Sequence, residues 1–80
     1  MLTVREHMIL RVEERWWKYA GAKDQHIRDQ LGLSPTRYYQ VLNRLIDRPE
    51  ALAAYPQLVN RLRRMRDRRR QARTTARRSA

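Results

Sequence analysis

The turn at residues 31–35, Leu-Gly-Leu-Ser-Pro, constrains the fold of this chain more than any other stretch. Gly32 is expected to stop the helix before it, because a tight turn favours glycine, which has no Cβ atom. Ser34 is a favoured N-cap residue, and Pro35 suits the first position of a helix because that position needs no backbone N–H. The stretch therefore predicts one helix that ends at Gly32 and another that begins at Pro35.

Apolar residues on both sides of this turn have the spacing of a helix-turn-helix unit. They are Ile27, Leu31, Leu33, Tyr38 and Val41. The first two are expected to point into the core, Leu33 fills the turn, and the last two return from the second helix. In DNA-binding proteins of this type the second helix projects into the major groove. Arg28 is a departure, because families of this type usually have a small residue directly after the inward-facing residue of the first helix. Its side chain must extend outward, or the helices must cross at another angle.

Helix signals also dominate the N-terminal part. Thr3 and Glu6 fit a capping box that starts a helix at about Val4, and Gly21 is placed to end it after about Tyr19. One face of this helix is expected to be buried, and it consists of Met8, Ile9, Val12, Trp16 and Tyr19.

Further helices are expected over residues 22–31, 35–47 and 49–54, with a last one from about Pro56. The buried face of the third is expected to hold Tyr38, Val41, Leu42, Leu45 and Ile46. The last helix places Leu58, Leu62 and Met65 on one face. The sequence thus predicts an all-α fold class: a small domain of four to five helices built around a helix-turn-helix, with a basic C-terminal helix or tail.

The charge is distributed unevenly along the chain. Nineteen lysines and arginines against eight acids give a net charge of +11. Residues 57–80 hold ten arginines and one acid, whereas residues 1–56 hold nine basic and seven acidic residues. We expect a helical domain over residues 1–66 and an arginine-rich tail over residues 67–80 that is flexible when unbound. Such a tail is typical of nucleic-acid binding, although an acidic protein or an anionic membrane would also attract it.

Helical spacing separates the core face of the third helix from an outward face that can meet DNA. The residues expected to contact bases are Ser34, Thr36, Arg37, Tyr39, Gln40 and Asn43. Arg37 can pair with guanine through two hydrogen bonds, and Gln40 or Asn43 can pair with adenine in the same way. The residues expected to contact the DNA backbone are Arg44, Arg48, Arg61, Arg64, Arg68, Arg69, Arg70 and Arg73.

Trp17 and the size of the domain raise the question of a partner. An 80-residue domain has a thin core, so dimerisation or another partner is expected to add stability. Trp17 lies about 100° around the helix from Trp16, so the two cannot share one core face. We expect Trp17 to pack within the chain, over the last helix. The alternative is a homodimer patch that it forms with Leu10.

Signals for catalysis, cofactors and membranes are missing from the sequence. His7 and His26 stand on different predicted helices, the chain has no cysteine, and no phosphate-binding glycine loop is present. We therefore expect no enzyme, no metal and no other cofactor. No stretch approaches the roughly 20 apolar residues of a membrane span, and the N-terminus lacks the features of a signal peptide. We expect a cytoplasmic protein located on the nucleoid.

Three motifs carry a resemblance to a known family. They read WWKYAGAK (residues 16–23), GLSPTRYYQVLN (residues 32–43) and RPEALA (residues 48–53). With them, residues 14–69 resemble a family of short, basic actinobacterial proteins, also carried by phages of those hosts and catalogued as a domain of unknown function. The resemblance implies a small DNA-binding protein of helix-turn-helix type and supplies no catalytic residues.

Three functions follow as hypotheses. The first is binding of double-stranded DNA by a small transcriptional regulator or nucleoid-associated factor. The alternative is a protein-interaction module that binds an acidic partner, such as RNA polymerase or another DNA-binding protein. The third is binding of structured RNA, since arginine-rich segments serve that role too.

Overall fold

The computed structural model describes residues 1–15 and 17–79, with side chains up to residue 72. In this part the chain is helical and contains no strand, which confirms the predicted all-α class. The elements are α1 (Val4–Glu14), α2 (Ala20–His26), the π-helix η1 (Ile27–Leu31), α3 (Pro35–Leu45), α4 (Pro49–Ala54) and α5 (Pro56–Ser79).

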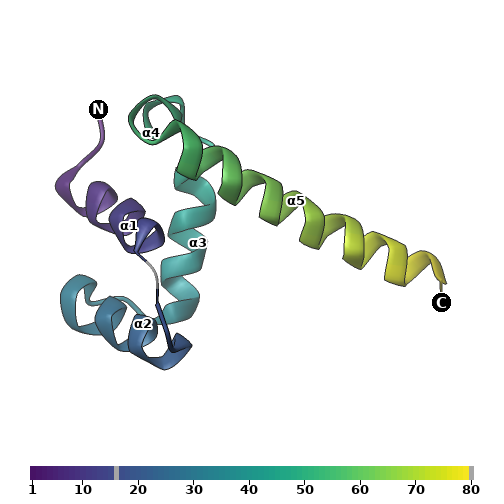
Figure 1. Cartoon of the computed structure of the whole chain (residues 1–80), viewed down its shortest axis with the longest axis horizontal. Coiled ribbons are helices and arrows are strands. Elements are labelled where there is room, and N and C mark those ends of the chain that lie inside the picture. Colours follow the sequence, from purple (N-terminus) through teal and green to yellow (C-terminus); the bar gives the residue numbers. More distant parts are fainter. Residues whose placement is uncertain (16, 80) are drawn as a thin grey trace.

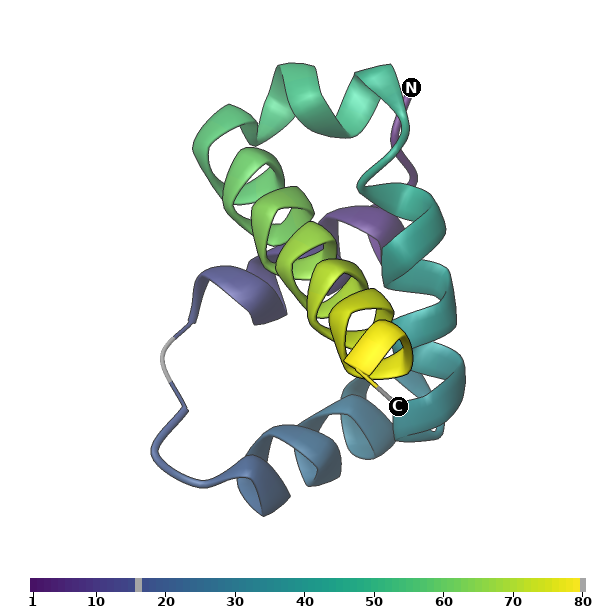
Figure 2. The same cartoon turned by 90° about the vertical axis from the view of Figure 1, so that its right-hand side faces the viewer.

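Helix α3 lies in the middle of the body, and α1 and η1 pack against it (Figure 1). Helix α5 packs against α1 and α4, and its C-terminal half then projects away from the body (Figures 1 and 2). The long dimension of the molecule, 43 Å against 30 and 21 Å, reflects this projection.

The core draws apolar side chains from all the helices except α2. The buried ones are Ile9, Leu10, Val12, Ile27, Leu31, Tyr38, Leu42, Leu45, Ile46, Ala51, Leu58 and Val59. Most of the predicted core residues of the second and third helices are among them, while Val41 and Leu33 are half-buried. The helix-turn-helix segment therefore supplies about half of this core.

Helix α1 ends at Glu14, so the predicted extension to Tyr19 is wrong. Carbonyl groups at a helix C-terminus need partners outside the helix, and here distant side chains provide them. Trp17 Nε1 donates to the Val12 carbonyl at 3.0 Å, and Arg61 Nη2 donates to the Glu13 carbonyl at 3.2 Å. Tyr19 is exposed and precedes α2, and the predicted core residue Trp16 lies outside the described residues.

The buried face of α1 also differs from the prediction. Leu10 is fully buried and therefore cannot form a dimer patch, while Met8 is 37% exposed. The reason is that α1 packs against both α3 and α5, which turns the face of Ile9, Leu10 and Val12 inward. On α5, Val59 is buried and Met65 is 42% exposed, because the helix leaves the body near that point.

The turn between η1 and α3 has the predicted chemistry. Gly32 has φ of 65°, the left-handed conformation expected of a residue that ends a helix. The Ser34 hydroxyl accepts the backbone N–H of Arg37 at 3.2 Å, and Pro35 is the first residue of α3. Arg5 of α1 donates to the Leu31 carbonyl at 3.0 Å, which ties the turn to the body.

The helix before this turn departs from α geometry. It begins at Ala20, so Gly21 lies inside it and does not end the first helix as predicted. From Ile27 to Leu31 the backbone is a π-helix, a rarer and wider form. Arg28 lies in this segment and its side chain is exposed, as the outward-extending alternative predicts.

The last helix is longer than its apolar face. The structure continues α5 to Ser79, so the predicted domain boundary at residue 67 falls inside one helix. Flexibility of residues 67–80 in the unbound protein stays a prediction. Across the described part of the chain, no helix has both the length and the apolar character that crossing a membrane requires.

Candidate nucleic-acid interface

The outward face of α3 carries the side chains predicted to contact bases. Ser34, Thr36, Arg37, Tyr39, Gln40 and Asn43 are all exposed. Tyr38, Leu42 and Leu45 of the same helix are buried, so the core fixes which face points outward. Arg37 and Gln40 lie together on that face, and Arg37 Nη1 donates to Gln40 Oε1 at 3.4 Å. Ser34 is already engaged by capping the helix.

A polar network inside the body holds α3 in place. The Tyr38 hydroxyl donates to Glu13 Oε2 of α1 at 2.5 Å, and Lys23 Nζ of α2 forms an ion pair with the same carboxylate at 2.8 Å. Burial raises the pKa of Tyr38, and the hydrogen bond to Glu13 adds to that shift. The pKa of Lys23 is raised as well: partial burial lowers it, but the hydrogen bonds and charge interactions with Glu13 and Tyr39 together outweigh that effect. Glu13 therefore links all three helices that form the helix-turn-helix body.

Lys23 extends this network toward the predicted interface. Its ammonium group lies 5.2 Å from the ring centroid of Tyr39, a distance at which a cation is attracted to an aromatic face. The rings of Tyr38 and Tyr39 meet edge to face with centroids 5.0 Å apart. These contacts place Tyr39 at the border of the outward face, so it is less available to a groove than Arg37 or Gln40.

Two arginines anchor α5 on the C-terminal end of α3. Arg63 Nε donates to the Ile46 carbonyl at 2.6 Å. Arg66 forms a two-pronged ion pair with Asp47, with N–O distances of 3.0 Å. The hydrogen bond from Arg66 holds the pKa of Asp47 below its usual range. Their positions, four and seven residues after the buried Val59, place both on the packed face of α5. That spacing is the signal by which the sequence could have distinguished them.

The other described arginines of α5 are exposed. They are Arg61, Arg64, Arg68, Arg69 and Arg70, all predicted to contact the DNA backbone. Arg44 of α3 is also exposed, and the side chain of Arg73 lies outside the described residues. Of these exposed arginines, Arg61 also fastens α5 to the end of α1 through the Glu13 carbonyl.

A known family matches this chain over nearly its whole length. The model of the family described as "Protein of unknown function (DUF3263)" matches residues 1–74. The chain belongs to this family. The predicted resemblance to a domain of unknown function is thereby confirmed. No curated protein and no solved structure matches the chain.

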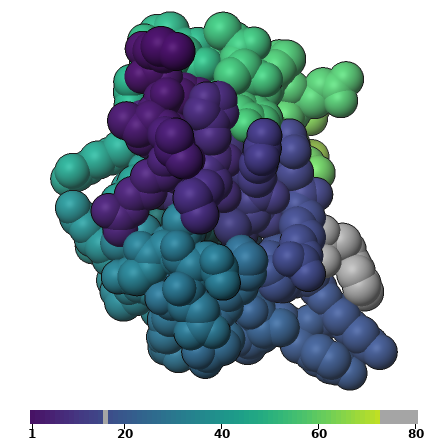
Figure 3. All heavy atoms as spheres, turned by 90° about the vertical axis from the view of Figure 1, so that its left-hand side faces the viewer, coloured from purple at the N-terminus to yellow at the C-terminus, as the bar shows by residue number. Residues whose placement is uncertain are grey.

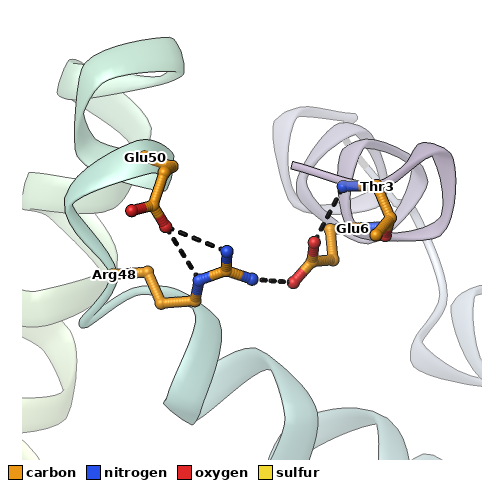
Figure 4. A network of polar contacts seen from close by, with 4 residues as sticks. All are labelled: Thr3, Glu6, Arg48 and Glu50. Atoms are coloured by element: carbon orange, nitrogen blue, oxygen red, sulfur yellow. Dashed lines mark hydrogen bonds and ion pairs between the residues drawn. The ribbon is translucent and has the colours of Figure 1, made fainter. Parts of the chain in front are cut away.

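In this DUF3263 protein, Arg48 has a different setting from the other predicted backbone contacts. Its guanidinium forms ion pairs with Glu6 of α1 and with Glu50 of α4 (Figure 4). Glu6 also accepts the Thr3 backbone N–H at 2.8 Å, which completes the predicted capping box. That hydrogen bond, with Arg48 adding to it, lowers the pKa of Glu6. Two carboxylates thus offset the charge of Arg48.

The two histidines of this DUF3263 protein have structural neighbours. His7 Nδ1 lies 3.0 Å from the Tyr55 hydroxyl, and the ring of His26 packs against Trp17 with centroids 5.1 Å apart. In the part of the chain that the structure describes, no three histidine, cysteine or acidic side chains gather as metal ligands would. The expectations about catalysis and cofactors stay predictions.

Proposed function

We propose that this protein binds double-stranded DNA, with the outward face of α3 in the major groove and the exposed arginines of α5 on phosphates. One observation carries the proposal. A helix whose outward residues are polar and exposed is joined at its C-terminal end, through Arg63 and Arg66, to a projecting arginine-rich helix. Under this proposal the protein is a small transcriptional regulator or nucleoid-associated factor, and it is located on the nucleoid.

The widths of an α-helix and of the DNA major groove favour DNA over RNA as the ligand. An α-helix with its side chains is about 10–12 Å wide, close to the width of about 12 Å of the DNA major groove. The major groove of an RNA duplex is too narrow for side chains to read. A helix that presents Thr36, Arg37, Gln40 and Asn43 therefore suits DNA. Binding of structured RNA is one outcome of the test below.

The arginines divide into two roles under this proposal. Arg37, beside Gln40, is the candidate for pairing with guanine, since its planar guanidinium can donate two parallel hydrogen bonds. Arg44, Arg64, Arg68 and Arg69 are exposed and suit phosphates, which fix register rather than sequence. Arg48 is left out, because Glu6 and Glu50 already bind it.

The proposal is tested in two steps. Duplexes are first selected from a random pool, and affinity is then measured for the selected duplex and for a scrambled one. Arg37→Lys keeps the charge but loses the paired hydrogen bonds, so preference for the selected duplex should fall by about tenfold or more. Arg44→Lys is the matched control and should preserve the preference. A double-stranded RNA and a single-stranded DNA of the same sequence are measured in parallel.

Three results would contradict the proposal. In the first, selection returns no enriched sequence while RNA binds more tightly than DNA. In the second, the two lysine variants lose preference equally, which removes α3 from base recognition. In the third, the protein binds none of the nucleic acids at low salt.

A further inference from the structure

A hollow opens on the side of the molecule away from the projecting half of α5. It lies between α1, Trp17 and η1, has a volume of about 250 Å³, and we call it the α1–η1 hollow. Its apolar wall consists of Met8, Val12, Trp17 and Leu31, and the side chains of Arg11 of α1 and of Arg15, the residue that follows α1, also line it. Figure 3 views this face, with α1 in purple to blue above the blue-green η1.

The outer face of α1, like the hollow, combines apolar and basic side chains. Val4, Met8 and Arg11 follow one another at helical spacing, and Arg15 comes directly after the helix; all four are exposed. Val4 is 78% exposed and Met8 37%, so apolar surface faces solvent at one end of this stripe. Two arginines face solvent at the other end, and no acid is among the residues that line the hollow.

We propose that the α1–η1 hollow and the outer face of α1 bind an acidic segment of a partner protein, with one apolar side chain of that segment in the hollow. The volume lies below the roughly 300–1,000 Å³ of sites for drug-sized ligands, which suits a single side chain. The planar guanidinium groups of Arg11 and Arg15 match flanking carboxylates. This site is separate from the proposed DNA interface and does not depend on it.

Charge decides against two other occupants. A second copy of this chain would place arginines against arginines, and like charges across an interface are unfavourable. The C-terminal segment of the chain is itself basic and is repelled for the same reason. A stacked nucleic-acid base is disfavoured because two other side chains already pack against the Trp17 ring. The Arg15 guanidinium lies 4.4 Å from its ring centroid, and His26 packs against it.

The test uses the full chain and two fluorescein-labelled peptides of glutamates, one with a central leucine and one with serine in its place. Binding is followed by fluorescence anisotropy at low salt. The leucine peptide should bind about tenfold more tightly than the serine peptide, because only leucine buries apolar surface. Met8→Gln should abolish that preference. Arg11→Gln/Arg15→Gln should weaken both peptides about threefold to tenfold.

The control is Arg68→Gln/Arg69→Gln, which removes the same charge from α5 and should leave peptide affinity unchanged. Because a variant can lose its fold, the wild-type protein supplies an independent readout. Its Trp17 indole resonance should shift when the leucine peptide is added. The proposal is overturned by equal affinity for the two peptides, by an equal effect of the two arginine pairs, or by a Trp17 resonance that does not move. Met8-dependent binding to anionic vesicles or single-stranded DNA, or a Met8-dependent dimer in sedimentation, would overturn it too.

Discussion

At the scale of single residues, Tyr38 does most to fix the orientation of α3. Its ring is fully buried, and its hydroxyl contacts two groups of α1, the Glu13 carboxylate at 2.5 Å and the Ile9 carbonyl at 3.3 Å. A carboxylate as little exposed as that of Glu13, whose side chain is 9% exposed, is costly unless it is paired, and here Tyr38 and Lys23 both pair with it. The ring of Tyr38 therefore packs in the apolar core while its hydroxyl donates a hydrogen bond.

Tyr38→Phe should destabilise the protein by about 1–3 kcal/mol, because it removes a hydrogen bond to a charged group without changing the shape of the core. Urea unfolding followed by circular dichroism measures the change. Tyr39→Phe is the matched control and should have little effect, since the Tyr39 side chain is 40% exposed. Equal losses for the two variants would show that the bond to Glu13 contributes nothing.

Glu6 makes the stability depend on pH. Its pKa is lowered in the folded protein by the Thr3 N–H and by Arg48. A lowered pKa stabilises the fold above the ordinary carboxyl pKa of roughly 4, and this contribution is lost as the pH falls through the folded value. Glu6→Gln keeps a capping side chain but not the charge, so it should be less stable than wild type at pH 7 and equally stable near pH 2. Glu14→Gln, at an exposed acid, is the matched control and should leave the stability at pH 7 unchanged.

At the scale of helices, the features that neighbouring residues determine were predictable from the sequence, and the features that distant residues determine were not. The turn at Gly32 and the helix starts at Pro35, Pro49 and Pro56 follow from capping and backbone preferences that neighbouring residues dictate. The end of α1 depends on donors that arrive from elsewhere in the chain, such as Arg61, so local sequence could not show it. The outward face of α3 was predictable because its core face has a regular period.

The arginine run of α5 shows the same limit at the site itself. By charge alone, Arg63, Arg64 and Arg66 look alike. Only their spacing from the buried Val59 distinguishes Arg63 and Arg66, which contact the C-terminal end of α3. Arg48 was predicted as a DNA contact because nothing local indicated Glu6, which lies on α1. Charge alone therefore identifies a basic segment but not the role of each residue in it.

The two glycines provide a test of the helix-turn-helix turn. Gly32→Ala should cost about 1–2 kcal/mol, because φ of 65° forces an L-residue into the left-handed region. Gly21 lies within α2, and a Cβ atom added there would meet no neighbouring atom within 4 Å. Gly21→Ala should therefore stabilise the protein by about 0.5–1 kcal/mol. Thermal unfolding measures the change in stability of each variant. A neutral Gly32→Ala variant would show that the turn can relax.

At the scale of the whole molecule, the two proposed binding surfaces lie on different elements. The outward face of α3, to whose C-terminal end α5 is joined through Arg63 and Arg66, and the exposed arginines of α5 make up the surface that we propose for DNA. The α1–η1 hollow is the surface that we propose for an acidic partner. If both proposals hold, the protein binds DNA and a second protein at once.

The salt dependence of duplex binding tests the central claim most directly. Log affinity falls with log salt concentration by about 0.9 for each phosphate contacted. Arg68→Gln/Arg69→Gln should therefore reduce the slope by about 1.8 relative to wild type. Arg11→Gln/Arg15→Gln, which removes the same charge from the α1–η1 hollow, should leave the slope unchanged. An equal reduction for both pairs, or no reduction for either, would contradict the assignment of α5 to the phosphates.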